Sequence, residues 1–212
     1  MSQAEEKQPF DLCGGHPALD FVNSLDERFD ERGPVESLCD YADLLRFTQQ
    51  TSLLHTRQVR RLGNTVAAEA ATRALRAARD LREAMAAMFY GRVDAHAPRS
   101  ADIRTLERYF RAASAHQELL WKQPAENSSA RSAPAWDWGR FETHAELPVW
   151  VVSQSASQLM LSDAMDRVRA CGVDTCRWLF LDTSKNHTRR WCKMKVCGNR
   201  MKARRFQARR EA

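Results

Sequence analysis

The sequence lacks the features of several common classes of protein. Nowhere in its 212 residues do eighteen consecutive apolar residues occur, which is the shortest run typical of a membrane-spanning helix. The first ten residues, MSQAEEKQPF, are polar and do not combine positive charge with an apolar run, as a secretory signal does. We therefore expect a soluble, cytoplasmic protein that has no membrane partner.

The common catalytic motifs are also missing. The sequence has no nucleophile elbow, no HExxH, and no H-x-E followed by P-C-x-x-C. Gly14 and Gly15 are not followed by the further glycine and the Lys-Ser/Thr pair of a phosphate-binding loop. These absences argue against an enzyme.

Cysteine is scarce, but four of the six cysteines are paired near the end of the chain. The pairs are Cys171-x4-Cys176 and Cys192-x4-Cys197, with fifteen residues between them. Each pair can hold one edge of a tetrahedral, structural Zn²⁺ site, which would have no open position for catalysis. The alternatives are ordinary buried cysteines or disulfides. Zinc is favoured because the segment is polar and basic, with little core of its own, and because a reducing cytoplasm disfavours disulfides.

Charge is distributed unevenly along the chain. Residues 163–212 hold 14 Lys and Arg against 5 Asp and Glu, a balance of +9, whereas residues 1–162 have a balance of −3. A nearly neutral body with a strongly basic end indicates a polyanionic partner, with nucleic acid ahead of a membrane surface.

Two groups of residues are candidates for contact with nucleic acid. One group lies on the loop before Cys192 and the other on a helix expected after Cys197. In order, they are Lys185, Asn186, Arg189 and Arg190, and then Arg200, Lys202, Arg204, Arg205, Arg209 and Arg210. Such cations can neutralise phosphates, and arginine can also bind guanine in the major groove. Alternatively, part of this charge neutralises a zinc–thiolate cluster, for which Arg189, Arg190, Lys193 and Arg200 are the candidates.

The C-terminal segment resembles the CGNR zinc finger. The tetrapeptide is present as Cys197-Gly198-Asn199-Arg200, after Arg190-Trp191-Cys192-x-Met194. Upstream, the run from Cys176 to Asp182, followed by Ser184, Asn186 and Arg189, also fits. The resemblance covers about forty residues and implies that Cys171, Cys176, Cys192 and Cys197 bind zinc and that the segment binds DNA.

A second resemblance lies near the start of the chain. The run from Cys13 to Leu25 resembles the opening of the ABATE domain, a domain of stress-induced transcription regulators that commonly precedes a CGNR finger. The residues that fit its pattern are Gly15, Leu19, Asp20, Phe21, Asn23 and Ser24. From the residues themselves, Cys13 and His16 are interpreted as turn residues without ligand duties.

Apolar periodicity predicts a mainly α-helical, multihelical body with room for minor β structure, followed by a small zinc finger made of a short β hairpin and a helix. We call residues 1–162 the body and residues 163–212 the finger segment. Helices are expected from Pro17, over 34–50, from Thr56 to Leu62, over 65–90, from Ser100 to about Leu120, from Pro148 to Leu161, and after Cys197. A polar loop is expected over 123–135, aromatic residues that return to the core over 136–141, and short strands at 167–169 and 177–180.

The sequence as a whole predicts a zinc-dependent regulator that binds duplex DNA. The body would sense a signal, such as a small-molecule effector, or form a homodimer. The alternative is a zinc-stapled module that binds RNA or an acidic protein partner without direct contact to DNA.

Overall fold

The computed structural model describes residues 7–123 and 131–211. The expected polar loop over 123–135 therefore lies partly outside the described residues. The body contains α1 (Pro17–Asn23), β1 (Leu25–Asp26), β2 (Val35–Glu36), α2 (Tyr41–Gln50), α3 (Thr56–Thr65), α4 (Ala68–Val93), α5 (Ser100–Ala115), β3 (Glu118–Lys122), β4 (Ala133–Asp137), the 3-10 helix η1 (Gly139–Phe141) and α6 (Leu147–Met160). The finger segment contains the 3-10 helix η2 (Asp163–Arg167), β5 (Val168–Ala170), β6 (Leu179–Leu181), the π-helical turn η3 (Met194–Gly198) and α7 (Asn199–Glu211).

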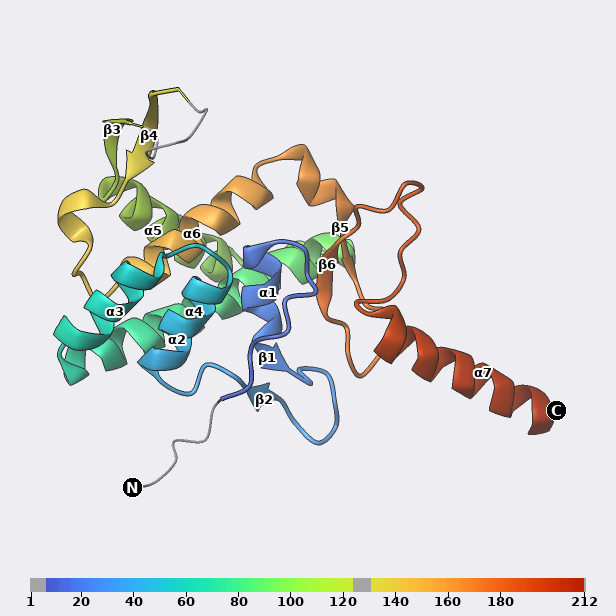
Figure 1. The fold of residues 1–212 in the computed structure, drawn as a ribbon. Helices are drawn as coiled ribbons and strands as arrows, with labels where there is room; N and C mark the ends of the chain where they lie inside the picture. The colour runs from blue at the N-terminus through green and yellow to red at the C-terminus, as the bar shows by residue number, and fades with distance from the viewer. Residues whose placement is uncertain (1–6, 124–130, 212) are drawn as a thin grey trace, which may run out of the picture.

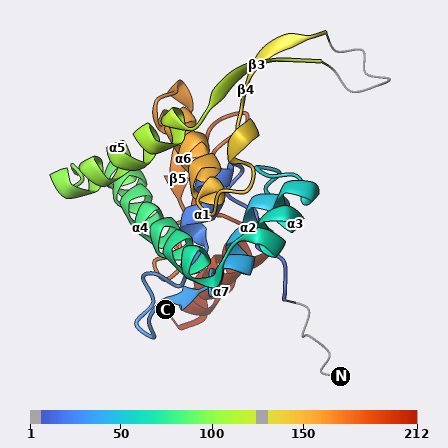
Figure 2. The ribbon, with the colours of Figure 1, turned by 90° about the vertical axis from the view of Figure 1, so that its left-hand side faces the viewer.

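The helices of the body pack around the short helix α1. This helix contacts α4 and α6, while α5 packs on both of these helices (Figure 1). The two-stranded ribbon β3–β4 and the helix α7 project from opposite ends of the molecule (Figures 1 and 2). In the described parts of the chain, no helix has the length and apolarity needed to cross a membrane. The predicted mainly α body, with minor β structure and a finger that ends in a helix, is confirmed.

Helix α1 begins at Pro17, as the sequence predicts, because proline suits the first helical position, where no N–H is needed. The ring nitrogen Nδ1 of His16 accepts a hydrogen bond from the Ala18 amide at 3.2 Å and caps the helix. The six residues of α1 after Pro17 are buried. Because all its sides are covered, α1 is part of the core and not a surface helix.

The prediction that a helix begins at Pro34 is wrong. Val35 and Glu36 form strand β2, which pairs antiparallel with β1, and α2 begins only at Tyr41. Asp40 starts this helix, since its side chain accepts from the Asp43 amide while the Asp43 carboxylate accepts from the Asp40 amide. This reciprocal capping box is a stronger helix start than proline alone.

The helix from Ser100 is shorter than predicted. It ends at Ala115, and residues Glu118–Lys122 form β3, which pairs along its whole length with β4. The aromatic residues after residue 135 have different environments, because the side chain of Trp138 is buried whereas that of Trp136 is 58% exposed. The predicted return of the aromatics to the core therefore holds for Trp138 and is wrong for Trp136.

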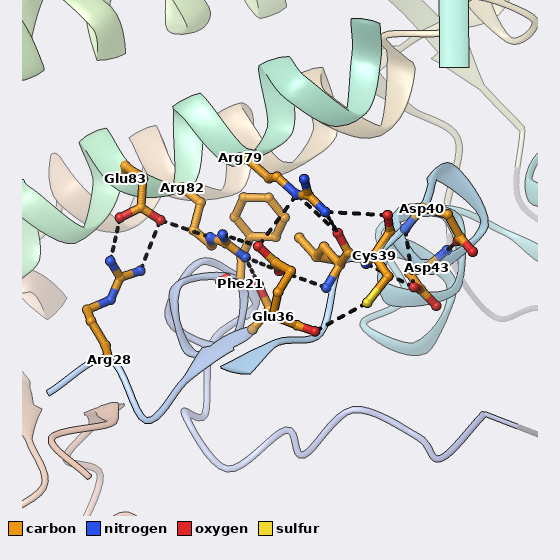
Figure 3. A network of polar contacts seen from close by, with 11 residues as sticks. Phe21, Arg28, Glu36, Cys39, Asp40, Asp43, Arg79, Arg82 and Glu83 are labelled. Carbon is orange, nitrogen blue, oxygen red and sulfur yellow. Dashed lines mark hydrogen bonds and ion pairs between the residues drawn. The ribbon is translucent and has the colours of Figure 1, made fainter. Parts of the chain in front are cut away.

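A buried ion pair connects the long helix α4 to the strand β2. The guanidinium of Arg82 is almost fully buried and donates to both carboxylate oxygens of Glu36, at 2.6 and 2.7 Å (Figure 3). It also donates to Glu83 and to the Ser24 hydroxyl. The Arg82 charge is accommodated inside the body because Glu36 gives it a bidentate partner there.

Replacing Glu36 by glutamine tests this pair. Glu36→Gln replaces the bidentate carboxylate of the buried Arg82 by a neutral amide, and only Glu83 remains as a charged partner, so we expect the free energy of unfolding to fall by about 3 kcal/mol. The matched control is Glu69→Gln on α4, whose side chain is 93% exposed; there the change should stay below about 0.5 kcal/mol. Urea unfolding followed by circular dichroism measures both, and equal losses in the two variants would contradict the assigned role.

Candidate metal centre and nucleic-acid interface

Four cysteines meet where the β5–β6 hairpin approaches the start of α7. Cys171 directly follows β5, and its amide donates to the Trp178 carbonyl at 2.9 Å. The turn that leads to Cys176 is closed by the Cys176 amide, which donates to the Val173 carbonyl at 2.9 Å. The Gly172 amide donates to the Arg190 carbonyl, also at 2.9 Å, and brings the second cysteine pair beside the first.

The four thiols, here called the cysteine tetrad, have the geometry of a metal site. All four Sγ atoms lie within 4.8 Å of one another. Cys192 Sγ lies 3.7 Å from Cys176 Sγ and 3.6 Å from Cys197 Sγ. A tetrahedral zinc site with Zn–S bonds of about 2.3 Å has S–S edges of about 3.8 Å. The tetrad therefore matches the size of a four-thiolate zinc site.

The charge state of the tetrad leads to the same conclusion. Hydrogen bonds from the Cys176 and Cys192 thiols lower the pKa of the Cys171 thiol. The contact with Cys171 in turn raises the pKa of Cys176, because two thiols this close cannot both ionise without a cation between them. A divalent cation removes this conflict, so the donor set fits a bound metal.

A fifth thiol, Cys13 of the body, lies against the tetrad without belonging to it. Its proximity, more than any other cause, raises the pKa of the Cys192 thiol. The sequence interpretation of Cys13 as a turn residue missed this contact. Cys13 and Cys192 are 179 positions apart, so their contact arises from the tertiary fold and no local sequence pattern indicates it.

The finger segment is held by the residues of the ABATE-like motif. The amide group of Asn23, on α1, is buried; it accepts from the Leu179 N–H at 2.8 Å and donates to the Leu179 carbonyl at 2.9 Å. The Leu181 N–H donates to the Gly14 carbonyl at 2.7 Å. Val168 and Leu179 share the main core with α1. We call these contacts the socket. They connect the edge of the β5–β6 hairpin to Gly14 and to α1.

The backbone at the start of the motif requires glycine at Gly14 and Gly15. A Cβ atom on Gly14 would lie 2.7 Å from the Asp20 carboxylate, and Gly15 has a φ of +72°, which favours glycine. The side chains of Trp178 and Trp191 pack against the tetrad. In addition, the Trp178 indole donates to Asp26 Oδ1 at 2.6 Å, a second link to the body.

The loop candidates differ in how accessible they are. Lys185, Asn186 and Arg190 are exposed. Arg189 is partly buried: its guanidinium donates to the carbonyls of Trp191, Cys192 and Cys13 and lies 4.2 Å from the centroid of the Phe180 ring. The structure thus gives Arg189 the structural role of joining the loop, the tetrad and the start of the body.

The candidates on α7 are all exposed. They are Arg200, Lys202, Arg204, Arg205, Arg209 and Arg210. Helix α7 projects into solvent (Figure 1), and its packing contacts are with η3. Among the described side chains, none of these six cations lies within 4.0 Å of a carboxylate. One of the residues considered for neutralising the tetrad, Lys193, pairs with Asp11 of the body at 2.5 Å. Besides Arg32, Arg200 helps to lower the pKa of the Asp30 carboxyl but forms no ion pair with it.

A cavity of about 210 Å³ lies beside the tetrad, between three of its cysteines and the loop after β1. Its body side carries the carboxylates of Asp11, Asp26, Glu27 and Asp30, and its finger side includes Cys176, Cys192 and Cys197. Arg32, Lys193 and Arg200 line the same cavity, and Arg32 and Lys193 form ion pairs with three of these carboxylates. The acidic charge of the cavity is therefore largely balanced by cations of the chain.

Two protein families match the chain, one after the other. The CGNR zinc finger family matches residues 167–210, and the ABATE family, described as "Putative stress-induced transcription regulator", matches residues 15–166. No curated protein sequence matches the chain significantly. The ABATE match covers more than half of the chain, so the protein belongs to this family and carries a CGNR zinc finger. That membership points to a regulatory role rather than an enzymatic one.

The carboxyl group of Asp20 lies beside the socket and makes the stability of the protein depend on pH. Burial raises the pKa of the Asp20 carboxyl to about 7, although a hydrogen bond from the Gly14 amide opposes this. The native state therefore keeps a proton that the unfolded chain releases above about pH 4, and stability falls as the pH rises towards 7. Asp20→Asn keeps the acceptor but cannot ionise.

We expect the unfolding free energy of the native protein, relative to that of Asp20→Asn, to fall by roughly 2–3 kcal/mol between pH 5 and pH 8. Urea unfolding at both pH values measures this difference, and the effect of pH on the cysteine tetrad cancels because both proteins contain it. Parallel stability profiles for the two proteins would show that Asp20 does not titrate in this range.

Proposed function

We propose that this ABATE-family protein is a zinc-dependent transcriptional regulator that acts in the cytoplasm and binds duplex DNA through α7. The observation that carries the proposal is the exposed helix α7, whose six cations lack carboxylate partners among the described side chains and which begins two residues after the ligand candidate Cys197. A helix of 13 residues with so little packing is marginally stable in water. Binding in a groove would provide the missing contacts.

The distribution of charge around α7 suits a groove better than a flat surface. At about 100° per residue, Arg200 and Arg204 lie on one flank of the helix, whereas Lys202, Arg205 and Arg209 lie on the opposite flank. The major groove of DNA accommodates an α-helix between two rows of phosphates. Cations on both flanks can therefore contact both rows at once. The exposed Lys185, Asn186 and Arg190 on the preceding loop extend the proposed interface.

The proposed metal ligands are Cys171, Cys176, Cys192 and Cys197. Bound zinc would supply a rigid four-point crosslink with no open ligand position, as in structural rather than catalytic sites. The tetrad joins the β5–β6 hairpin to η3, and the socket joins this hairpin to α1. These two connections together would orient α7 relative to the body, so that a change in the body could alter how α7 is presented to DNA.

Removal of the metal tests the first half of the proposal. We expect fluorescence anisotropy of a labelled DNA duplex to show binding by the zinc-loaded protein and at least a 100-fold loss of affinity after chelation or in Cys197→Ser, because the turn into α7 loses its crosslink. Cys39→Ser is the matched control, since Cys39 is exposed and lies outside the tetrad; its affinity should not change.

Circular dichroism of the same samples shows whether the body remains folded, which separates loss of α7 orientation from global unfolding. Three results would count against the proposal. Preference for single-stranded RNA would indicate an RNA regulator. Equal affinity with and without metal would remove zinc from the mechanism. Failure of the zinc-loaded protein to bind either nucleic acid at low salt would indicate an acidic protein partner.

Salt dependence tests the contribution of α7. If all six cations of α7 contact phosphates, a plot of log Kd against the logarithm of the salt concentration should have a slope of about 5. The double variant that carries Arg204→Ala and Arg205→Ala should reduce this slope by about 2. The control pair is Arg73→Ala with Arg76→Ala, two exposed arginines of the body on the first half of α4. Titrations at several salt concentrations measure the slopes, and an equal reduction by the control pair would mean that α7 has no special role.

A further inference from the structure

The ribbon β3–β4 has an apolar face that nothing in the described structure covers. Residues directly opposite one another in antiparallel strands share a face, and successive residues alternate between faces. The register pairs Leu119 with Trp136 and Trp121 with Pro134, so these four residues form one face. The exposed fractions of Leu119, Trp121 and Trp136 are 61%, 66% and 58%.

The opposite face of the ribbon is polar. It carries the charged residues Glu118, Lys122 and Asp137, between which lie Leu120, Ala133 and Ala135. Lys122 forms an ion pair with Asp137, and Glu118 forms one with Arg140 of η1 at 2.8 Å. The charges on this side are therefore matched within the chain. The ribbon is amphipathic, although it extends beyond the helices of the body (Figure 2).

The ribbon is firmly attached at its base. Trp138, the residue after β4, is buried against Trp150 of α6, with ring centroids 6.3 Å apart and nearly parallel. The apolar face therefore begins where the core of the body ends. A two-stranded ribbon is only marginally stable in water, and two exposed tryptophans on one face add an apolar surface that water solvates poorly.

We infer that this face is a homodimer interface, in which the apolar ribbon face of one chain packs on the same face of a second copy. A two-fold axis makes such a contact self-complementary, because Leu119, Trp121, Pro134 and Trp136 of each chain meet the same residues of the partner. No charged side chain lies on this face, so pairing two identical faces brings no like charges together. Trp and other aromatics are the residues that dominate such contacts.

The available area agrees with a second copy as the occupant. A whole tryptophan side chain offers about 250 Å². The exposed parts of Trp121 and Trp136 therefore offer roughly 300 Å² per chain, and Leu119 and Pro134 raise this area to roughly 500 Å². Two faces then bury about 1,000 Å², the lower limit for a specific protein–protein interface. The two strands of the ribbon carry one Lys against one Glu and one Asp, so they hold no excess positive charge that would attract an anionic membrane or a nucleic acid.

This dimer would leave both copies of α7 free. The ribbon and α7 project from opposite ends of the molecule (Figure 1), so ribbon-to-ribbon packing does not cover the finger segment. The inference does not depend on the proposed binding of DNA, since it concerns a different surface and is tested by mass.

Sedimentation equilibrium of the zinc-loaded full-length protein tests the inference. We expect a mass of twice the 24.3 kDa chain at micromolar concentration. In Trp121→Lys and in Trp136→Ser, the dimer dissociation constant should rise at least 100-fold. The matched control is Leu161→Ser, which removes an apolar side chain that is 86% exposed at the end of α6; this variant should remain dimeric.

Circular dichroism confirms that each variant keeps its helices, and the two substitutions on different strands guard against a local folding defect in either one. A native protein that stays monomeric at 100-fold higher concentration would overturn the inference. So would a dimer that persists in both variants. Flotation of a monomeric native protein with phosphatidylglycerol vesicles, lost in Trp121→Lys, would assign the face to a lipid surface instead.

Discussion

The hydrogen bonds between the Asn23 side chain and the backbone of Leu179 are the contact on which the rest of this structure depends. They are buried and join residues 156 positions apart. An amide side chain here satisfies both the N–H and the carbonyl of a strand edge that would otherwise be buried without partners. This contact lets a small hairpin with little core of its own share the core of the helical body.

The hairpin held in this way positions the cysteine tetrad, and the tetrad in turn determines where α7 begins. The distances between the thiols suit zinc, and the closed donor set suits a structural metal rather than a catalytic one. Arg189 supports the same arrangement, because it donates hydrogen bonds both to the Trp191 carbonyl beside the tetrad and to the Cys13 carbonyl of the body. The basic charge of the segment is therefore divided: Arg189 stabilises the fold, whereas the exposed cations of α7, which have no carboxylate partner among the described side chains, are the proposed contacts for DNA.

Much of this organisation could be predicted from the sequence, but not the contacts that assemble it. The long helix α4 and the cysteine pairs have strong local patterns, and the structure contains both. The role of Asn23 and the proximity of Cys13 to the tetrad arise from packing between distant segments, which periodicity does not encode. Strands β1 and β2 have only two residues each, too few to show alternation. The β3–β4 ribbon was missed because Leu119, Leu120 and Trp121 continue an apolar pattern that also fits a helix.

X-ray absorption at the zinc edge of the purified full-length protein tests the central claim most directly. The account predicts one zinc per chain with four sulfur neighbours at about 2.3 Å and no nitrogen or oxygen in the first shell. Substituting Cys13 by serine should leave this spectrum unchanged, because Cys13 lies beside the tetrad and not in it. A mixed sulfur and nitrogen or oxygen shell, or protein that is fully folded without metal, would contradict the account.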